Sequence, residues 1–313
     1  MERYNTYSAH LKKRFGEKVY KLPVNLPVTC PNRMEGRGCS FCAGVGTGFE
    51  AMSEEVPVRA QLEETKQKIG RRYGAKKFLA YFQNYTNTFL PLSDFKAYVL
   101  EALETEDIVG ISVSTRPDCI REDYLKFLKE AVLDRGYAVT IELGLQTVNY
   151  HTLKSISRGH TLAEYLNAVL LTAPFGFEIC THVILNLPGD TMEDAVETAR
   201  VVSALPVDVV KAHSLYIPKN SVMYEDYRDG KIVLCTKEEY LDRLTEFVAN
   251  IREDMVIERL FSRVPEEDAV FSNWGVSWWK LKDLFDEKME QKGYVQGCKC
   301  DYLNGAALRR WRI

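Results

Sequence analysis

Short apolar runs alternate with amphipathic segments from about residue 18 onward. Two amphipathic segments, 121–135 and 191–204, place their apolar side chains on one helical face. The second begins with a helix N-cap signal, Thr191 followed by Asp194. The apolar runs are rich in β-branched residues on both faces, which is typical of strands buried in a parallel sheet, and they cover 77–82, 107–114, 138–144, 179–187 and 207–215.

Repeated strand–helix alternation predicts right-handed crossovers and a parallel sheet. Polar residues gather after several strands, and no glycine-rich phosphate fingerprint follows the first strand, so a barrel is favoured over an open sheet. We expect an α/β protein with a core domain over 1–230, a lead-in followed by a partial (βα)6 TIM-like barrel. A C-terminal α/β extension over 231–313 should pack on the barrel, with helices over 237–252 and 278–291 and a strand near 255–261.

Composition adds few constraints. The 313 residues are 46% hydrophobic and 27% charged, which is ordinary for a globular protein. A net charge of −3 gives no global attraction to nucleic acid. The longest uncharged stretch, 78–93, is too short to cross a bilayer, and the first residues lack an apolar signal core. We therefore expect a cytoplasmic protein without membrane contact.

Three cysteines in one loop carry the main chemical signal: Cys30 and Cys39 have eight residues between them, and Cys42 follows after two more, preceded by Phe41. Thiolates suit zinc and iron–sulfur clusters. Zinc needs a fourth ligand, and no paired cysteine or histidine follows nearby. Three thiolates can hold three irons of a cubane cluster and leave one iron open, which favours a cluster over zinc or unligated thiols.

Four further segments occur in order: ISVSTRPD (111–118), IELGLQT (141–147), SRGHT (157–161) and HVILNLPGDT (182–191). Together with the cysteine loop they resemble the radical SAM superfamily over about residues 1–230. The resemblance is closest to its Elongator-like branch and to the YhcC/YtqA-like family within it. It implies a radical SAM barrel with a 4Fe–4S cluster on Cys30, Cys39 and Cys42 and S-adenosylmethionine (SAM) on the open iron. The cysteine spacing departs from the commonest pattern of the superfamily, in which three residues separate the first two.

The resemblance also suggests SAM contacts. Glu142, at the end of a predicted strand, can accept from the ribose or amino group of SAM, or sit in a structural ion pair. The planar fork of Arg158 suits the SAM carboxylate or an ordinary salt bridge, and Gly159 allows close approach. Arg116 can hold an anionic substrate group or pair with Asp118.

The loop after the second strand, with Gln83, Asn87 and Thr88, occupies the place where many relatives carry a Gly-Gly-Glu-like motif for the SAM amino group. These side chains are candidate acceptors, or simply a polar loop. By resemblance, main-chain atoms near Ile184 and Leu215 should flank the adenine.

The catalytic residues are not defined by the sequence. Candidates are His182, Lys211 and His213 on the fifth and sixth strands, because histidine titrates near neutrality; burial as ordinary core residues is the alternative. Outside the core domain, Cys298 and Cys300 are interpreted as surface thiols, with a redox or substrate-linked role as the alternative. The tail tryptophans, Trp274, Trp278 and Trp279, either stack on bases or, as we expect, close the barrel as core.

The resemblance implies reductive cleavage of SAM to a 5′-deoxyadenosyl radical. It suggests tRNA as substrate, at the carbon-5 side chain of the wobble uridine. Implied partners are tRNA, an electron donor such as flavodoxin or ferredoxin, and a methyltransferase acting afterwards. Two alternatives stay open: radical chemistry on a small molecule or peptide, and a zinc-stabilised binding module.

Overall fold

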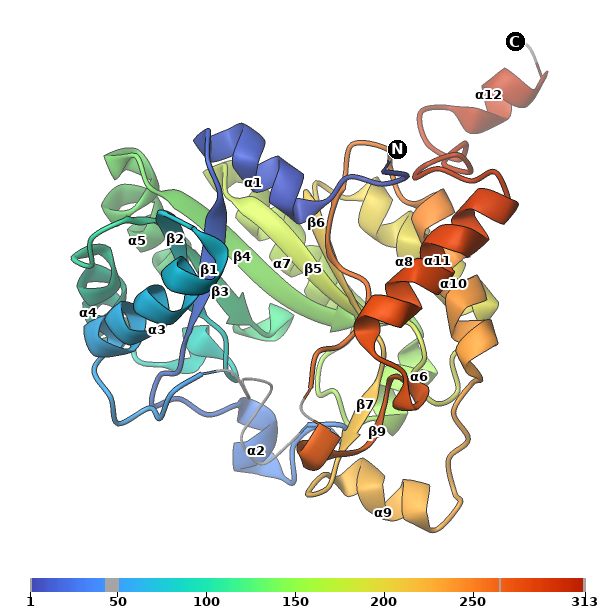
Figure 1. Ribbon diagram of the computed structural model, residues 1–313, viewed down its shortest axis with the longest axis horizontal. Coiled ribbons are helices and arrows are strands. Elements are labelled where there is room, and N and C mark those ends of the chain that lie inside the picture. The colour runs from blue at the N-terminus through green and yellow to red at the C-terminus, as the bar shows by residue number, and fades with distance from the viewer. Residues whose placement is uncertain (1, 43–50, 265, 312–313) are drawn as a thin grey trace.

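A seven-stranded parallel sheet curves into an open barrel in the order β1-β2-β3-β4-β5-β6-β8 (Figure 1). The computed structural model describes residues 2–42, 51–264 and 266–311. The partial barrel expected from the sequence is confirmed. Its strands are β1 (Val19–Val24), β2 (Lys77–Phe82), β3 (Ile108–Thr115), β4 (Ala138–Gln146), β5 (Glu178–Ile184), β6 (Val209–His213) and β8 (Val256–Arg259), and β7 (Tyr216–Pro218) pairs with β9 (Ala269–Ser272) in a separate antiparallel ribbon.

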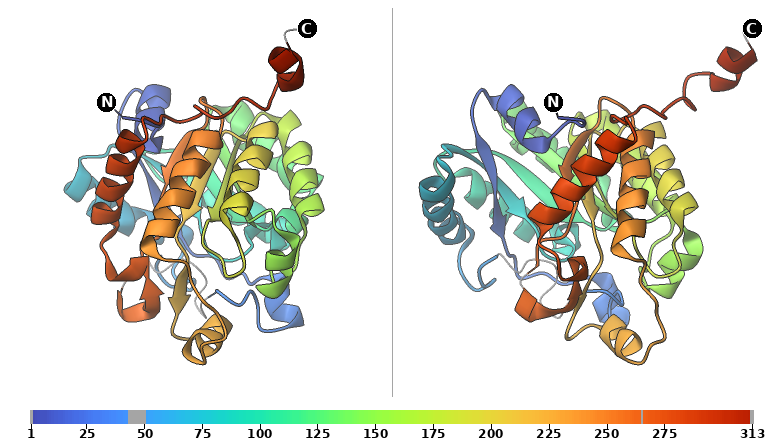
Figure 2. Two further views of the ribbon diagram at one scale, coloured as in Figure 1. Left: turned by 90° about the vertical axis from the view of Figure 1, so that its right-hand side faces the viewer. Right: turned by 45° about the vertical axis from the view of Figure 1, so that its right-hand side comes forward.

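Helices cover the outer face of the sheet, as Figure 2 shows for α7, α8, α10 and α11. The main core lies between these layers and includes Phe82, Phe95 and Tyr165, all fully buried. Thr191 forms the expected N-cap as part of a capping box with Asp194. The helices are α1 (Tyr7–Phe15), α2 (Pro31–Glu35), α3 (Val58–Tyr73), α4 (Leu92–Leu103), α5 (Glu122–Ala131), α6 (Tyr150–Ser155), α7 (Leu162–Thr172), α8 (Met192–Ala204), α9 (Val222–Arg228), α10 (Lys237–Asn250), α11 (Trp278–Gln291) and α12 (Ala306–Trp311).

The C-terminal tail takes part in the barrel itself. Strand β8, expected in an extension packed on the barrel, instead hydrogen-bonds to β6 and becomes the outermost strand of the sheet. The division at residue 230 stays a prediction. Trp274 and Trp278 pack against the main core as expected, but the prediction is wrong for Trp279, which is 64% exposed.

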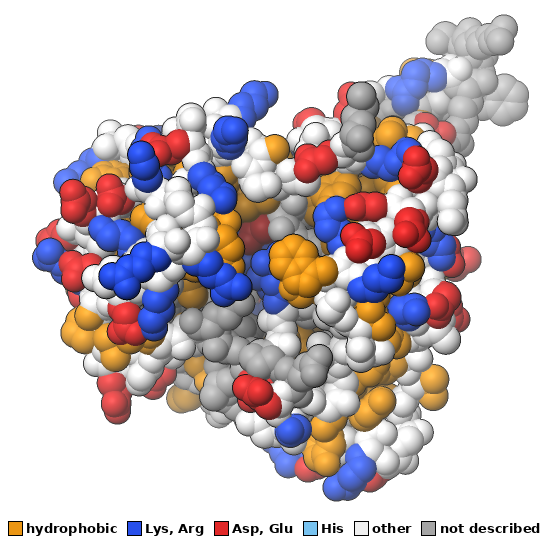
Figure 3. Space-filling view, viewed as in Figure 1, with side chains coloured by type: hydrophobic (Ala, Val, Ile, Leu, Met, Phe, Trp, Pro, Cys, Tyr) orange, Lys and Arg blue, Asp and Glu red, His pale blue; other side chains and the backbone are white. Residues whose placement is uncertain are grey.

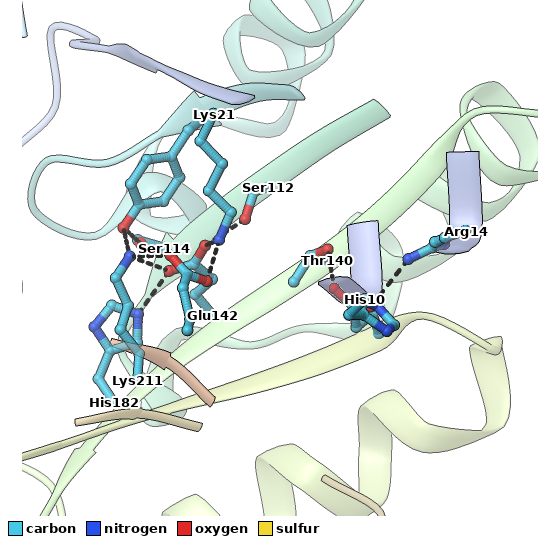
Figure 4. A network of polar contacts seen from close by, with 12 residues as sticks. His10, Arg14, Lys21, Ser112, Ser114, Thr140, Glu142, His182 and Lys211 are labelled. Atoms are coloured by element: carbon cyan, nitrogen blue, oxygen red, sulfur yellow. Dashed lines mark hydrogen bonds and ion pairs between the residues drawn. The ribbon is translucent and has the colours of Figure 1, made fainter. Parts of the chain in front are cut away.

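Helix α1 closes the end of the barrel where the strands begin. The backbone N–H of Ile257 on β8 donates to the carbonyl of Asn5 at 2.8 Å, which joins the lead-in to the sheet edge. Glu178, the first residue of β5, accepts from His10 at 2.8 Å and from Arg14 at 3.0 Å (Figure 4). These contacts cover the amino ends of the strands and leave the carboxyl ends accessible. No helix in the described part of the chain is long and apolar enough to span a bilayer.

Candidate active site

The cysteine loop is anchored to the loop after α6 by one asparagine. The Asn32 side-chain amide nitrogen lies 2.8 Å from the carbonyl oxygens of both Ser157 and Arg158, and 3.3 Å from the Cys39 sulfur. Gly159 follows with φ +77°, and a Cβ atom there would lie 2.0 Å from the Asn32 oxygen. Glycine is therefore required at this position, which agrees with the close approach that the sequence predicted.

Each of the three loop cysteines lies beside a guanidinium group. This positive charge would offset the negative charge of three thiolates around a bound cluster. Arg116 also forms a two-pronged ion pair with Asp118, which is one of the two alternatives given for it. The nitrogen-to-sulfur distances are 3.7 Å for Arg116–Cys30, 3.6 Å for Arg158–Cys39 and 3.9 Å for Arg33–Cys42.

All three cysteines line one cavity at the carboxyl ends of the strands, which we name the cysteine cavity. Tetrahedral zinc would hold its sulfurs about 3.8 Å apart. The three sulfurs, which the structure describes, do not all lie within 4.8 Å of one another. The donor set of three thiolates, spread more widely than zinc needs, fits a cubane cluster.

Glu142 lies midway along β4, because this strand runs two residues beyond its predicted end. Its carboxylate accepts from Ser112 at 2.5 Å, from Lys21 at 2.6 Å, from His182 at 2.6 Å and from Lys211 at 3.2 Å (Figure 4). Burial alone would raise the pKa of Glu142, but the two ammonium groups hold it well below its usual range. The structural ion pair, one of the two alternatives, is therefore present; the SAM contact stays a prediction.

A second carboxylate completes this buried network. Glu258 lies 2.5 Å from Lys21 and 3.0 Å from Lys211. Lys21 belongs to β1 and Glu258 to β8, so this ion pair joins the two outermost strands of the open sheet. The charges of the two ammonium groups and the two carboxylates cancel. The ion pair between Lys21 and Glu258 connects β1 and β8, which do not pair with each other through their main chains. We call these four residues, Lys21, Glu142, Lys211 and Glu258, the charge quartet.

The three catalytic candidates lie together. The rings of His182 and His213 stack with centroids 5.4 Å apart. Burial lowers the pKa of both imidazoles, so both are neutral at pH 7. For Lys211, burial opposes the charge, but Glu142 and Glu258 outweigh it and raise the pKa. Lys211 therefore holds its proton firmly and is unsuited to act as a base.

A second cavity adjoins the first, and Gln83 and His182 are among the residues that line both. We name it the β6 cavity, because the end of β6 and the following turn form one wall. Ile184 and Leu215, predicted to flank adenine, line it, as do Lys211 and His213. Of these two cavities, Glu142 and Arg158 line the cysteine cavity and not the β6 cavity.

Asn87 and Thr88 line neither cavity. The Asn87 amide donates to the carbonyls of Phe82 at 2.9 Å and Ser114 at 2.8 Å. The Thr88 hydroxyl lies 2.6 Å from that of Thr115. These side chains hold the loop after β2 against β3, and this geometry does not favour their predicted SAM contacts.

Comparison with known proteins agrees with this geometry. The model of the Radical SAM superfamily matches residues 24–202, and that of the Radical_SAM C-terminal domain matches residues 207–291. The chain belongs to the radical SAM superfamily. It is 31% identical to YtqA of Bacillus subtilis over 95% of this chain and 92% of that protein. It is 32% identical to YhcC of Escherichia coli over 94% of each chain.

Among solved structures, this radical SAM chain resembles Elp3 of the archaeon Methanocaldococcus infernus with a TM-score of 0.67. The identity is 18%, over 89% of this chain and 64% of that one. As a member of this superfamily, the protein is a radical SAM enzyme, with a 4Fe–4S cluster and SAM as its cofactors.

Lys21, Asn32, Arg33 and Glu258 are among the residues of this site that sequence reasoning missed. A signal was available for two of them, since a charged residue beside apolar residues in a strand, as Lys21 in VYKLPV and Glu258 in VIER, needs a partner when it is buried. Asn32 and Arg33 stand between the first two cysteines, where nothing in the sequence distinguishes them from other loop residues.

Proposed function

We propose that this radical SAM enzyme acts on tRNA and remodels the side chain at carbon 5 of the wobble uridine. Two relatives support the substrate class. The tRNA uridine(34) acetyltransferase of Methanocaldococcus infernus is 24% identical over 61% of this chain and 35% of its own length. Elongator complex protein 3 of Schizosaccharomyces pombe is 22% identical over 91% of this chain and 61% of its own.

One observation carries the SAM chemistry: the three thiols share their cavity with a guanidinium that has a hydrogen-bonding position to spare. Arg158 donates to the Gly144 carbonyl at 2.7 Å, while its buried Nε has no partner among the described residues. We assign this N–H to the SAM carboxylate. When bound, the reduced cluster cleaves SAM to methionine and a 5′-deoxyadenosyl radical.

The other predicted contacts are divided between the two cavities. Glu142 and Gln83 face the methionine end of SAM in the cysteine cavity. Ile184 and Leu215 give the adenine an apolar wall in the β6 cavity. The neutral His182 lines both cavities, so it would contact SAM, the substrate or both.

Aromatic side chains beside the β6 cavity support an RNA substrate. Arg263 lines the cavity and lies 4.1 Å from the ring centroid of Trp278. The exposed Trp279 ring lies 3.4 Å from that of Trp278. Unpaired bases stack on such aromatic and guanidinium surfaces. Figure 3 shows hydrophobic side chains among Lys and Arg near the middle of this face.

Partners and setting follow from the proposal. A flavodoxin or ferredoxin supplies the electron, a methyltransferase acts on the product, and the reaction takes place in the cytoplasm. A small molecule or peptide as substrate is the competing possibility, and the experiment below separates it from tRNA.

The proposal is tested first with reconstituted protein under nitrogen. Reduction should convert SAM to 5′-deoxyadenosine, and retained zinc without cleavage would refute the radical chemistry. Nucleoside digests of bulk tRNA from deletion and parent cells then test the substrate. An altered wobble uridine in the deletion is expected, and identical digests would refute the tRNA proposal in favour of a small molecule or peptide.

The tryptophan surface is tested separately by Trp279→Ala. Stacking is worth about 1–3 kcal/mol per base, so tRNA binding should weaken by roughly 5- to 150-fold. Leu170→Ala on α7 is the matched control, because Leu170 is similarly exposed, at 59%. Equal tRNA affinity of the two variants would remove this surface from the substrate path.

A further inference from the structure

Strand β8 carries a bulge that turns two consecutive side chains into the barrel. The register with β6 shifts after Ile257, so that Arg259 pairs with Lys211 and Glu258 is left over. Consecutive side chains of a regular strand point to opposite faces, and a bulge re-aims one of them. Glu258 reaches Lys21 and Lys211 inside the barrel, and Arg259 lines the β6 cavity.

The lining of the β6 cavity is cationic. It includes Lys211, Arg259 and Arg263, and no carboxylate among the described residues that form it. Lys211 is already matched by the two carboxylates of the charge quartet. Arg263 is exposed and stacks on Trp278. The two histidines of the cavity are neutral. Arg259 is therefore the cation of this lining for which no partner has yet been described.

The Arg259 side chain has no hydrogen bond or ion pair to any residue that the structure describes, although it is half-buried. Its charge is felt in the cavity, where it adds to burial in lowering the pKa of His213. A partly desolvated guanidinium without an anion is unfavourable unless a ligand supplies one. The bulge thus places an unsatisfied cation beside the position proposed for adenosine.

We propose that Arg259 binds an oxyanion of the substrate, a carboxylate or a phosphate, in the β6 cavity. The planar guanidinium can hold either group with two parallel hydrogen bonds. The SAM carboxylate is not this anion, because Arg158 in the cysteine cavity is assigned to it. The inference rests on the proposed function, which it deepens: the substrate carries negative charge close to the carbon that the radical attacks.

The two sources of the oxyanion predict different behaviour of Arg259→Gln. Two RNAs are compared in binding: tRNA from deletion cells, which carries the unprocessed uridine, and an unmodified transcript of the same sequence. A carboxylate on the base predicts that the variant loses about 10- to 100-fold affinity for the cellular tRNA alone. A backbone phosphate predicts that the variant binds both RNAs more weakly. The slope of log affinity against log salt concentration should then become shallower by about one unit.

Arg135→Gln is the matched control, because Arg135 is exposed and precedes β4 at the closed end of the barrel. Arg259→Lys keeps the charge without the fork and should recover only part of the affinity. A second measurement requires no tRNA: phenylglyoxal labelling of Arg259, mapped by mass spectrometry, should slow in inorganic phosphate or acetate, whereas labelling of Arg135 should not.

The outcomes are distinguishable. If Arg259→Gln binds both RNAs as Arg135→Gln does, and neither anion protects Arg259 from labelling, the anion site is refuted. If the parent enzyme binds no tRNA at all, the proposed substrate class fails. Protection of Arg259 by phosphate or acetate then still supports the anion site.

Discussion

Removing Lys21 from the charge quartet should destabilise the protein strongly. Lys21 lies 2.6 Å from Glu142 and 2.5 Å from Glu258, and these side chains are 11%, 0% and 10% exposed, respectively. Lys21→Met keeps the packing volume but leaves two buried carboxylates facing the single ammonium of Lys211. Breaking a buried ion pair on one side costs about 3–5 kcal/mol, because the remaining charge is desolvated without compensation. We expect a loss of that size in the free energy of unfolding.

The double variant Lys21→Met with Glu258→Gln restores charge balance, since one carboxylate and one ammonium remain. Its free energy of unfolding should lie within about 1–2 kcal/mol of that of the parent. This implies a coupling energy of about 2 kcal/mol or more between Lys21 and Glu258. Lys68→Met is the matched control: Lys68 pairs with Glu64 on the exposed side of α3 at 2.6 Å and should cost less than about 0.5 kcal/mol. Urea denaturation under nitrogen, at equal iron content, measures the parent, Lys21→Met, Glu258→Gln, the double variant and Lys68→Met, which completes the double-mutant cycle.

The pH dependence gives an internal check. The pKa values of Glu142 and Glu258 are lowered in the parent. Their stabilising contribution is therefore present above the usual carboxyl pKa and is lost as the pH falls through the folded-state values. In Lys21→Met, protonation neutralises the buried carboxylate that has lost its ammonium partner. The difference in free energy of unfolding between this variant and the parent should therefore become smaller from pH 8 to pH 5. A single variant as stable as Lys68→Met, or a double variant showing the sum of two large losses, would refute this account of the quartet.

Three further predictions concern the loops around the cavities. Cys39→Ala should abolish iron binding and SAM cleavage together, and iron analysis with retained turnover would contradict its ligand role. Arg33→Gln should make the reduction potential of the cluster more negative, since a positive charge beside Cys42 favours the added electron; an unchanged potential in an EPR-monitored titration would contradict this. Burial raises the pKa of Asp190 to about 6, so its contribution to stability is full below the usual value of 3.8 and is lost as the pH rises through 6. The free energy of unfolding of Asp190→Asn, relative to that of the parent, should therefore rise by about 1–3 kcal/mol between pH 4 and pH 7 in urea denaturation. A difference that does not change with pH would contradict the raised pKa.

Much of the fold follows from local pattern. Strand β2 and helix α11 begin and end where the sequence predicts, because a buried strand between turn signals and an amphipathic helix are local features. The cysteine loop was equally visible, since the thiols lie close in the sequence. Boundaries were less reliable where tertiary contacts extend a strand, as in β4, which continues to Gln146.

The amino-acid sequence by itself determined the alternation of strands and helices, the three thiols and the family, because each depends on residues near one another in the chain. Only the tertiary structure decided that Lys21 meets Glu258, 237 residues away, that the tail supplies β8, and that a bulge turns Arg259 inward. These features depend on which strands become neighbours and in what register they pair. The alternation of apolar and polar residues along a strand does not contain this information. The local sequence pattern gives the least information about the open edge of the barrel. There, ion pairs between residues distant in the sequence complete the site.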